Sequence, residues 1–294
     1  ELGVGLFPGI DKEFADAAIE IIRGGADTAQ PWFLHVNFTA PHDPLFAPPN
    51  GKENISLDNV PLPANHLPEH PFDHGNLKGR DEILMPFPRT RSATGRLIGA
   101  YYTVIEYLDL QVGRIFDAVE QSNQGRNTII IYTSDHGLAV GSHGLRGKQN
   151  MYEHTFNVPL IIAGPGIPSN RRTSAQVYLR DIFPTTCALA DVPIPASVTA
   201  KSFENVIHDP LGPGRASVFG YFQDSQRMIR SGRWKLIRYP NLGKWQLFDL
   251  DSDPDEISNL YFRDDLEPVR ARLTTQLQKW TLEKGDPAMQ GAPD

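Results

Sequence analysis

The chain has 294 residues, of which 40% are hydrophobic, so it is long enough to bury the core of one large domain or of two smaller ones. A formal net charge of -7 argues against a protein that binds nucleic acid independently of sequence, because such proteins need a basic face to neutralise phosphates. The sequence contains no run of eighteen apolar residues that would predict a membrane span. Residues 1–10 lack the basic start and apolar stretch of a signal peptide. We therefore expect neither nucleic acid nor a membrane among its partners.

The first predicted elements are a helix and a strand, followed by a long irregular segment. Asp11 is suited to begin a helix whose apolar residues recur every three or four positions, and Gly24 is suited to end it. Residues 32–38 are predicted to form a strand. The segment 41–90 is rich in proline and glycine and shows little periodicity, which predicts a long loop. Because such loops are usually functional or disordered, we expect an ordered loop at the rim of a substrate cleft.

The middle of the chain alternates between helix and strand. Apolar residues between 94 and 119 keep helical spacing and predict a long helix. Residues 128–132 and 158–163 are short, β-branched and apolar on both faces, which is typical of buried parallel strands. The predicted fold class is therefore α/β, with a mostly parallel central sheet and helices on both of its faces.

The pattern changes after about residue 212. Short strands separated by turns are followed by one helix near 266–283, which predicts a small C-terminal antiparallel sheet packed by one helix. The Pro-Gly group at 210–214 is the predicted boundary, dividing the chain into an α/β domain over 1–211 and an antiparallel subdomain with a terminal helix over 212–294. The predicted strands are Ser217–Phe222, Arg227–Arg230, Trp234–Tyr239 and Trp245–Leu250.

Two side chains of the kind that binds metals follow the strand at 128–132. In open α/β sheets ligands bind beyond the carboxyl ends of the strands, which is where Asp135 and His136 lie. A carboxylate and an imidazole can share one divalent ion, and Gly137 permits the turn that brings both inward. The alternative is an ordinary polar strand end followed by a turn, and for the Asp-His-Gly triplet alone that alternative is favoured.

The residues that follow this pair favour a functional site. Three glycines and two cations occur in 141–148, between two apolar strands, and describe a loop that can approach an oxyanion closely. Lys148 is the expected contact, because a compact ammonium with three donors suits a sulfate or phosphate oxygen and the charge that grows on a leaving oxygen. The alternative for Lys148 is a solvated surface lysine.

His42 lies just beyond the strand predicted at 32–38. A histidine there can donate to an anionic oxygen or protonate a leaving group, because its charge changes near neutral pH. Without the other motifs it would be an ordinary loop histidine. We expect the Asp135 and His136 pair and Lys148 to converge on one anion pocket.

Five short motifs follow one another along nearly the whole chain. Each is weak alone, but in this order they resemble the type I sulfatases of the alkaline phosphatase superfamily. The motifs are Ala-Pro-His-x-Pro at 40–44, Thr-Ser-Asp-His-Gly at 133–137, Gly-Leu-x-Gly-Lys-x-x-x-Tyr-Glu at 144–153, Val-Pro-Leu-Ile at 158–161, and the run with Trp-Lys-Leu-Ile and Leu-Phe-Asp-Leu within 234–256.

The resemblance implies roles for several of these residues. Asp135 and His136 would be metal ligands, with calcium the most frequent metal and Mg²⁺ or Mn²⁺ as alternatives, and His42 and Lys148 would be catalytic residues in contact with the sulfate group. The resemblance also implies hydrolysis of a sulfate ester through a formylglycine hydrate, which the metal would orient while offsetting charge on the sulfuryl oxygens. His143 and Arg146 lie close enough in sequence to line the cleft and bind substrate.

The residue that would attack the ester is not found. The family's formylglycine is made from a cysteine or serine in a Cys/Ser-x-Pro/Ala-x-Arg motif, whereas Cys187 continues as Ala-Leu-Ala-Asp. Ser92 and Ser142 have the arginine but the wrong central residue. The paired-aspartate strand end that supplies other metal ligands in the family is also absent, and two ligands hold calcium poorly because it takes about six to eight oxygens. We therefore expect this chain alone to be inactive, with 1–211 an incomplete sulfatase-type domain.

Three accounts fit this incomplete pattern. The preferred one is a C-terminal fragment of a longer enzyme; the others are a missing portion supplied as a separate polypeptide, and a sheet retained in a protein that no longer catalyses. A homo-oligomer would also cover the apolar faces of an incomplete sheet. The resemblance implies a periplasmic or secreted protein, and no signal in this chain identifies the compartment.

The leading function is metal-dependent hydrolysis of a sulfate ester, carried by a small molecule or a sulfated carbohydrate. One alternative is a phosphodiester or phosphonate monoester hydrolase, which shares the superfamily's metal site. The other, from a different class, is a non-catalytic protein that binds sulfate esters or glycans.

Overall fold

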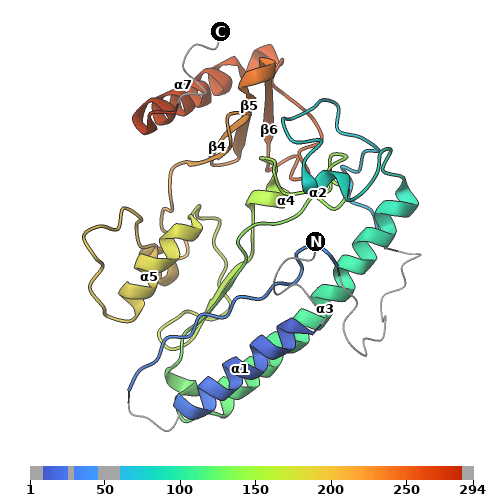
Figure 1. The fold of residues 1–294 in the computed structure, drawn as a ribbon. Coiled ribbons are helices and arrows are strands. Elements are labelled where there is room, and N and C mark those ends of the chain that lie inside the picture. Colours follow the sequence, from blue (N-terminus) through green and yellow to red (C-terminus); the bar gives the residue numbers. More distant parts are fainter. Residues whose placement is uncertain (1–8, 26–29, 46–59, 287–294) are drawn as a thin grey trace.

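A computed structural model describes residues 9–25, 30–45 and 60–286 of the chain. Figure 1 shows long helices and a two-stranded sheet at one end of the molecule, and a four-stranded sheet with a helix at the other. Short 3-10 turns connect several of the elements. The α-helices are α1 (Ile10–Gly25), α2 (Arg80–Ile83), α3 (Arg91–Gln121), α4 (Glu153–Phe156), α5 (Ile182–Leu189), α6 (Glu204–His208) and α7 (Glu267–Lys284). The strands are β1 (Ile130–Thr133), β2 (Leu160–Ala163), β3 (Val218–Phe222), β4 (Gln226–Ser231), β5 (Trp234–Tyr239) and β6 (Lys244–Asp249).

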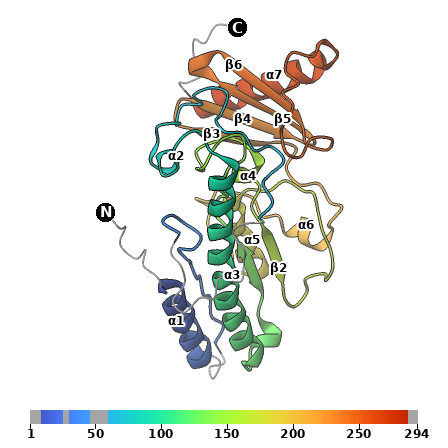
Figure 2. The same ribbon diagram turned by 90° about the vertical axis from the view of Figure 1, so that its right-hand side faces the viewer.

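The two longest helices expected in the first half of the chain are confirmed as α1 and α3. The side chain of Thr90 accepts a hydrogen bond from the Ala93 amide at 3.2 Å and so caps the start of α3. Figures 1 and 2 show α1 and α3 side by side, and their contact buries a cluster in which Ile19 and Ile22 meet Ala118 and Val119. Burial of this apolar stripe, rather than intrinsic propensity, is the main source of helix stability here.

The short strands β1 and β2 form where they are expected, but their predicted parallel arrangement is wrong. They pair antiparallel, with Ile130 opposite Ala163 and Thr133 opposite Leu160. The hydroxyl of Thr133 donates to the Pro159 carbonyl at 2.8 Å, so the chain enters β2 beside the point where it leaves β1. A parallel pair would need a crossover back to the start of β1, which the connection between them does not make.

The strand predicted at 32–38 is also wrong. These residues are extended but pair with no strand among the described residues, and Phe33 is 77% exposed. An extended segment becomes a strand only when a neighbour accepts its backbone hydrogen bonds, and the local pattern of apolar residues does not reveal whether that neighbour is present.

The C-terminal half contains the predicted antiparallel sheet, in the order β3-β4-β5-β6. Successive residues of its strands face opposite sides, as the two-residue period of a strand requires. On one side Ile229, Leu236 and Leu247 pack against Leu273 and Leu277 of α7. On the other side Met228, Ile237, Tyr239 and Phe248 pack against the chain between β1 and β2, through Ala139, Leu145, Met151 and Tyr152.

This shared core joins the two halves of the chain. The connection between β1 and β2, which carries several candidate site residues, packs directly on the C-terminal sheet. The fold is α/β with a small antiparallel sheet, as expected, while the boundary predicted near residue 211 stays a prediction. Within the part of the chain that the structure describes, no helix has the length and apolar character needed to span a membrane.

Part of the long proline-rich segment lies outside the described residues, at 46–59. Residues 60–90 have a defined structure: the Arg89 amide donates to the Pro68 carbonyl at 2.7 Å within the segment, and the His143 amide of the loop at 141–147 donates to the Asn65 carbonyl at 2.9 Å. The expectation of an ordered loop is therefore confirmed for 60–90, and its position at the rim of a substrate cleft stays a prediction.

Candidate functional site

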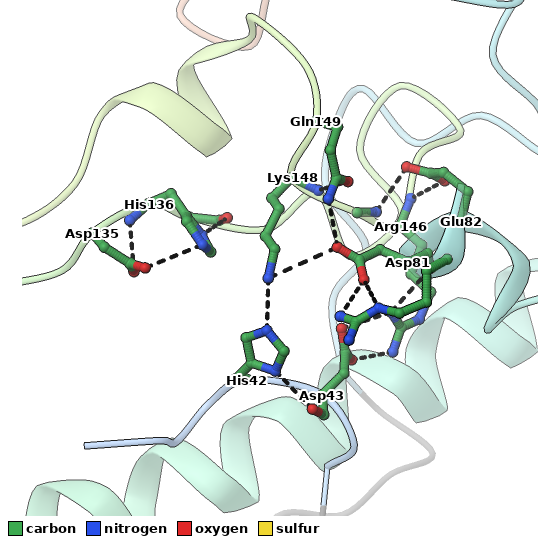
Figure 3. Close-up of polar contacts among 12 residues, drawn as sticks. His42, Asp43, Asp81, Glu82, Asp135, His136, Arg146, Lys148 and Gln149 are labelled. Atoms are coloured by element: carbon green, nitrogen blue, oxygen red, sulfur yellow. Dashed lines mark hydrogen bonds and ion pairs between the residues drawn. The ribbon is translucent and has the colours of Figure 1, made fainter. Parts of the chain in front are cut away.

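His42 and Lys148 are brought into direct contact by the fold. The Nζ atom of Lys148 lies 2.8 Å from Nε2 of His42, although the two residues are 106 positions apart (Figure 3). The other ring nitrogen, Nδ1, lies 2.7 Å from the Asp43 carbonyl, which can only accept, so Nδ1 carries a proton. In the neutral ring Nε2 is then the acceptor, and it faces the ammonium of Lys148.

A buried ion pair links the loop of His42 to the loop of Lys148. The guanidinium of Arg146 forms a bidentate pair with the carboxylate of Asp43, next to His42. Both side chains are nearly inaccessible, at 7% and 6% exposure. Since a bidentate pair of this kind fixes orientation as well as distance, it holds His42 and Lys148 on the same side of the structure.

Asp135 and His136 form a second pair directly after β1. Nε2 of His136 lies 3.2 Å from Oδ2 of Asp135, and the side chain of Asp135 is 80% exposed. Nδ1 of His136 lies 3.1 Å from the Gly137 carbonyl, which requires a proton on Nδ1. The Nε2 lone pair and the carboxylate therefore face each other and can share either a proton or a cation.

Gly137 is required at this turn because its backbone lies very close to the backbone of α4. A Cβ atom at this position would lie 1.9 Å from the carbonyl oxygen of His154. The Gly137 amide also donates to the Thr155 carbonyl at 3.0 Å. Any larger residue would push Asp135 and His136 away from their present position.

The donors at this turn are an incomplete metal site. Among residues 9–25, 30–45 and 60–286, no group of three or more histidine, cysteine, aspartate or glutamate residues is arranged to hold a metal ion. One carboxylate and one imidazole suit a divalent cation chemically, but hard cations such as calcium take about six to eight ligands. Among the described residues no hydrogen bond or ion pair joins this pair to Lys148, and Figure 3 shows the two pairs in one view.

His143 and Arg146, which were predicted to line the cleft, are both buried, and their role in substrate binding stays a prediction. The ring of His143 stacks on Tyr152 at a centroid distance of 3.8 Å, and burial lowers the pKa of His143 to about 3. Arg146 has its charge satisfied by Asp43. A glycine-rich loop can carry either buried or exposed side chains. The sequence alone therefore does not show that these two side chains are buried.

The sequence prediction missed two groups of residues near the loop that carries His143 and Lys148. Asp81 and Glu82 of α2 contact the loop that carries Lys148, and His70, His74 and His154 gather with His143 around Tyr152. Both groups lie in segments without helical or strand periodicity. The signal that could have suggested Asp81 and Glu82 is the occurrence of adjacent acidic residues in a short helix within a proline-rich loop.

Two protein-family models match the sequence. The model described as Sulfatase matches residues 4–192, and the model described as N-sulphoglucosamine sulphohydrolase, C-terminal, matches residues 141–283. The first match covers more than half of the chain and includes His42, Asp135, His136 and Lys148.

Curated relatives carry sulfatase names. The chain is 28% identical over 295 residues to a sulfatase of Formosa agariphila, covering 95% of this chain and 57% of the relative. It is 30% identical over 297 residues to arylsulfatase K of Bos taurus, covering 85% of this chain and 52% of the relative. The chain thus spans about half the length of the curated relatives it matches.

Solved structures share the fold. One is a protein in complex with its substrate D-glucosamine-2-N,6-O-disulfate, with a TM-score of 0.79, 21% identity, and coverage of 96% of this chain and 71% of that one. Another is the phosphonate monoester hydrolase of Agrobacterium radiobacter, with a TM-score of 0.77, 22% identity, and coverage of 97% and 63%. Together with the sequence matches, these similarities show that the chain belongs to the sulfatase family, the type I sulfatases of the alkaline phosphatase superfamily, whose members are sulfuric ester hydrolases.

Proposed function

We propose that the whole protein is a sulfatase that hydrolyses the sulfate ester of a small molecule or an oligosaccharide. The observation that carries this proposal is the contact of 2.8 Å between Lys148 and His42. The Lys148 ammonium donates to an anion directly, and the His42 ring beside it becomes a second donor at Nε2 when it is protonated. The solved neighbour bound to D-glucosamine-2-N,6-O-disulfate supports a sulfated sugar as the substrate class.

The two residues would act on the sulfate group in different ways. A sulfate oxygen beside this pair would accept from the Lys148 ammonium, which offsets the charge that grows as the ester bond breaks. Nδ1 of His42 donates to the Asp43 carbonyl, so Nε2 is the ring nitrogen that faces Lys148. In the imidazolium form Nε2 also carries a proton, which it can donate to a sulfate oxygen or to the leaving oxygen.

Asp135 and His136 would provide two ligands of a divalent metal, with calcium expected and Mg²⁺ or Mn²⁺ as alternatives. When bound, such a metal supplies positive charge near the sulfuryl oxygens and the nucleophile. Because the described residues offer only this carboxylate and this imidazole, we assign no step of the reaction to the metal. Their mutual contact of 3.2 Å supports a shared cation.

We also propose that the remaining ligands and the formylglycine nucleophile belong to residues outside this sequence, in an enzyme of the periplasm or the cell exterior. The chain spans 57% and 52% of two curated relatives and contains no Cys/Ser-x-Pro/Ala-x-Arg motif. Intact mass and N-terminal sequencing of the native protein test this. A native mass equal to 32.7 kDa would instead favour the non-catalytic sulfate-ester or glycan-binding alternative.

Turnover by the whole protein provides the direct test. We expect hydrolysis of an aryl sulfate, and we expect Lys148→Ala and Asp135→Ala each to reduce kcat/KM by about 10²-fold or more while circular dichroism stays unchanged. Lys279→Ala, at an exposed lysine of α7, is the matched control. Near-normal turnover in either variant would remove that residue from the site. Faster hydrolysis of an aryl phosphonate would assign the protein to the phosphonate monoester hydrolases, which share its fold.

A further inference from the structure

The short helix α2 reaches the loop of Lys148 with two buried carboxylates. The side chains of Asp81 and Glu82 are 1% and 0% exposed, although both lie in a proline-rich loop where acidic residues are normally solvated (Figure 3). Burying a carboxylate is costly unless it is paired and hydrogen-bonded, so the partners of these two residues indicate what the helix does.

Glu82 fixes the backbone just before Lys148. Its Oε2 accepts from the Arg146 amide and its Oε1 from the Gly147 amide, each at 2.9 Å. The charge is balanced by Arg89 at 2.6 Å, whose side chain is also fully buried. Gly147 permits this approach, because a Cβ atom there would lie 2.9 Å from Oε1 of Glu82. The loop is therefore clamped one residue away from Lys148.

Asp81 acts on the Lys148 side chain itself. Its Oδ2 accepts from Nε2 of Gln149 at 2.8 Å and lies 3.8 Å from Nζ of Lys148. Its Oδ1 accepts from Nε of Arg80 at 2.7 Å. Burial alone would raise the pKa of Asp81, but the hydrogen bonds from Gln149 and Arg80 and the nearby charge of Lys148 lower it, so the group is an anion beside the lysine.

Lys148 is thus held from two sides. His42 lies 2.8 Å from Nζ and Asp81 lies 3.8 Å from it, and these come from separate loops that the fold brings together. The Lys148 side chain is 16% exposed, so most of it is enclosed by neighbouring residues, unlike a free surface lysine. An ammonium has three N–H donors, and two of them can point toward His42 and Asp81. The third can point toward a bound anion.

We propose that Asp81 is a positioning residue of the sulfatase site: it aims the ammonium of Lys148 at the anion beside His42, while Glu82 fixes the backbone that carries the lysine. This inference rests on the proposed function for the role of the anion, but the Asp81 to Lys148 coupling can be measured without turnover. The proline-rich loop would then contribute to the site by orienting Lys148, without contacting the sulfate itself.

The test is competitive acylation of this chain with acetic anhydride, read by peptide mass spectrometry. Only the neutral amine reacts, so removing the neighbouring anion makes Lys148 easier to deprotonate and faster to acylate. We expect Asp81→Asn to raise the Lys148 rate at pH 8 about tenfold, relative to the exposed Lys279 of the same chain. Asp81→Glu should restore part of the protection. The matched control is Asp265→Asn, which removes the same charge from an exposed pair with Arg263.

A second variant covers the case in which Asp81→Asn does not fold. Arg80 is 62% exposed and competes with Lys148 for Asp81, so Arg80→Gln is expected to slow Lys148 acylation severalfold, the opposite direction. An unchanged pH–rate profile of Lys148 in Asp81→Asn, or in Arg80→Gln if the first variant is unfolded, would overturn the proposal. Inorganic sulfate added to the wild-type chain tests the proposed function separately. A failure of sulfate to protect Lys148 counts against the anion site, and not against the positioning by Asp81.

Discussion

The two sheets of this protein are built from similar residues but differ in how they are covered. In the C-terminal sheet, Ile229, Leu236 and Ile237 are 0% exposed because α7 covers one face and the loop after β1 covers the other. In the two-stranded sheet, Ile161 is 59% exposed and Tyr132 is 36% exposed. A β-branched apolar run therefore predicts a strand, but its contribution to stability depends on what packs against it.

The same contrast applies to the polar groups. Lys148 and Arg146 are held by buried carboxylates, whereas Asp135 is 80% exposed and its carboxylate contacts its chain neighbours Ser134 and His136. The half of the site that packs on the C-terminal sheet is thus rigidly supported. If burial rather than residue type determines stability, substitutions in the buried C-terminal sheet should lower the free energy of unfolding more than substitutions in the exposed two-stranded sheet.

The largest effect is expected at Lys235, in the covered sheet. Its side chain is 0% exposed and pairs with Glu256 at 2.8 Å and with Glu153 at 3.1 Å, which joins α4 to β5. Lys235→Met would leave buried carboxylates without their cation, and we expect it to lower the free energy of unfolding by about 3–5 kcal/mol. Urea denaturation measures this. In the control Lys279→Met, at an exposed lysine, the loss should be below about 0.5 kcal/mol.

The next effect concerns the apolar core of the same sheet. Leu236 lies between the strands and α7 and is fully buried. Leu236→Ala should cost about 2–5 kcal/mol, because it removes transfer free energy and leaves a cavity. A loss below about 1 kcal/mol in urea denaturation would show that the cover by α7 is looser in solution than in the structure.

An intermediate effect is expected for each single histidine under the C-terminal sheet when the pH is lowered. Burial lowers the pKa of His143 to about 3 and those of His70 and His74 to about 4, so these rings are neutral in the folded protein. The unfolded chain binds protons below about pH 6.5, so stability is complete above that pH and is lost as the pH falls toward 4. Between pH 7 and pH 5 the loss is roughly 2 kcal/mol for each such histidine.

His143→Phe isolates one of these contributions. The phenyl ring can keep the stack on Tyr152 but cannot take a proton, so the variant should lose roughly 2 kcal/mol less than the wild type between pH 7 and pH 5. The measurement is urea denaturation at both pH values. His208→Phe, at a histidine whose side chain is 51% exposed, is the control. Equal pH dependence in His143→Phe and the wild type would contradict the assignment of His143 to the core.

The smallest effect is expected in the uncovered sheet. Ile161→Ala should cost less than about 1 kcal/mol, because most of this side chain is already in water. Urea denaturation at two protein concentrations measures it. A loss as large as that of Leu236→Ala would mean that β2 is covered in solution, and a dependence on protein concentration would identify a second copy of the chain as the cover.

Much of the fold follows from local patterns, and the site follows only in part. The helices α1 and α3 and the strands β3 to β6 lie where apolar spacing and turn residues predict them. The antiparallel pairing of β1 with β2 and the missing strand at 32–38 were not predicted. Strand direction and strand pairing depend on residues far away in sequence, and a short apolar run is compatible with either arrangement.

By itself, the sequence determined which residues can form helices and strands, and which side chains can bind an oxyanion or a metal, because periodicity and chemical type are local properties. Only the tertiary structure decided that His42 meets Lys148, that His143 is a core residue, and that Asp81 and Glu82 reach the lysine loop. The contacts to the lysine loop join segments 60 or more positions apart, and they depend on the packing of the C-terminal sheet and of the proline-rich loop against that loop.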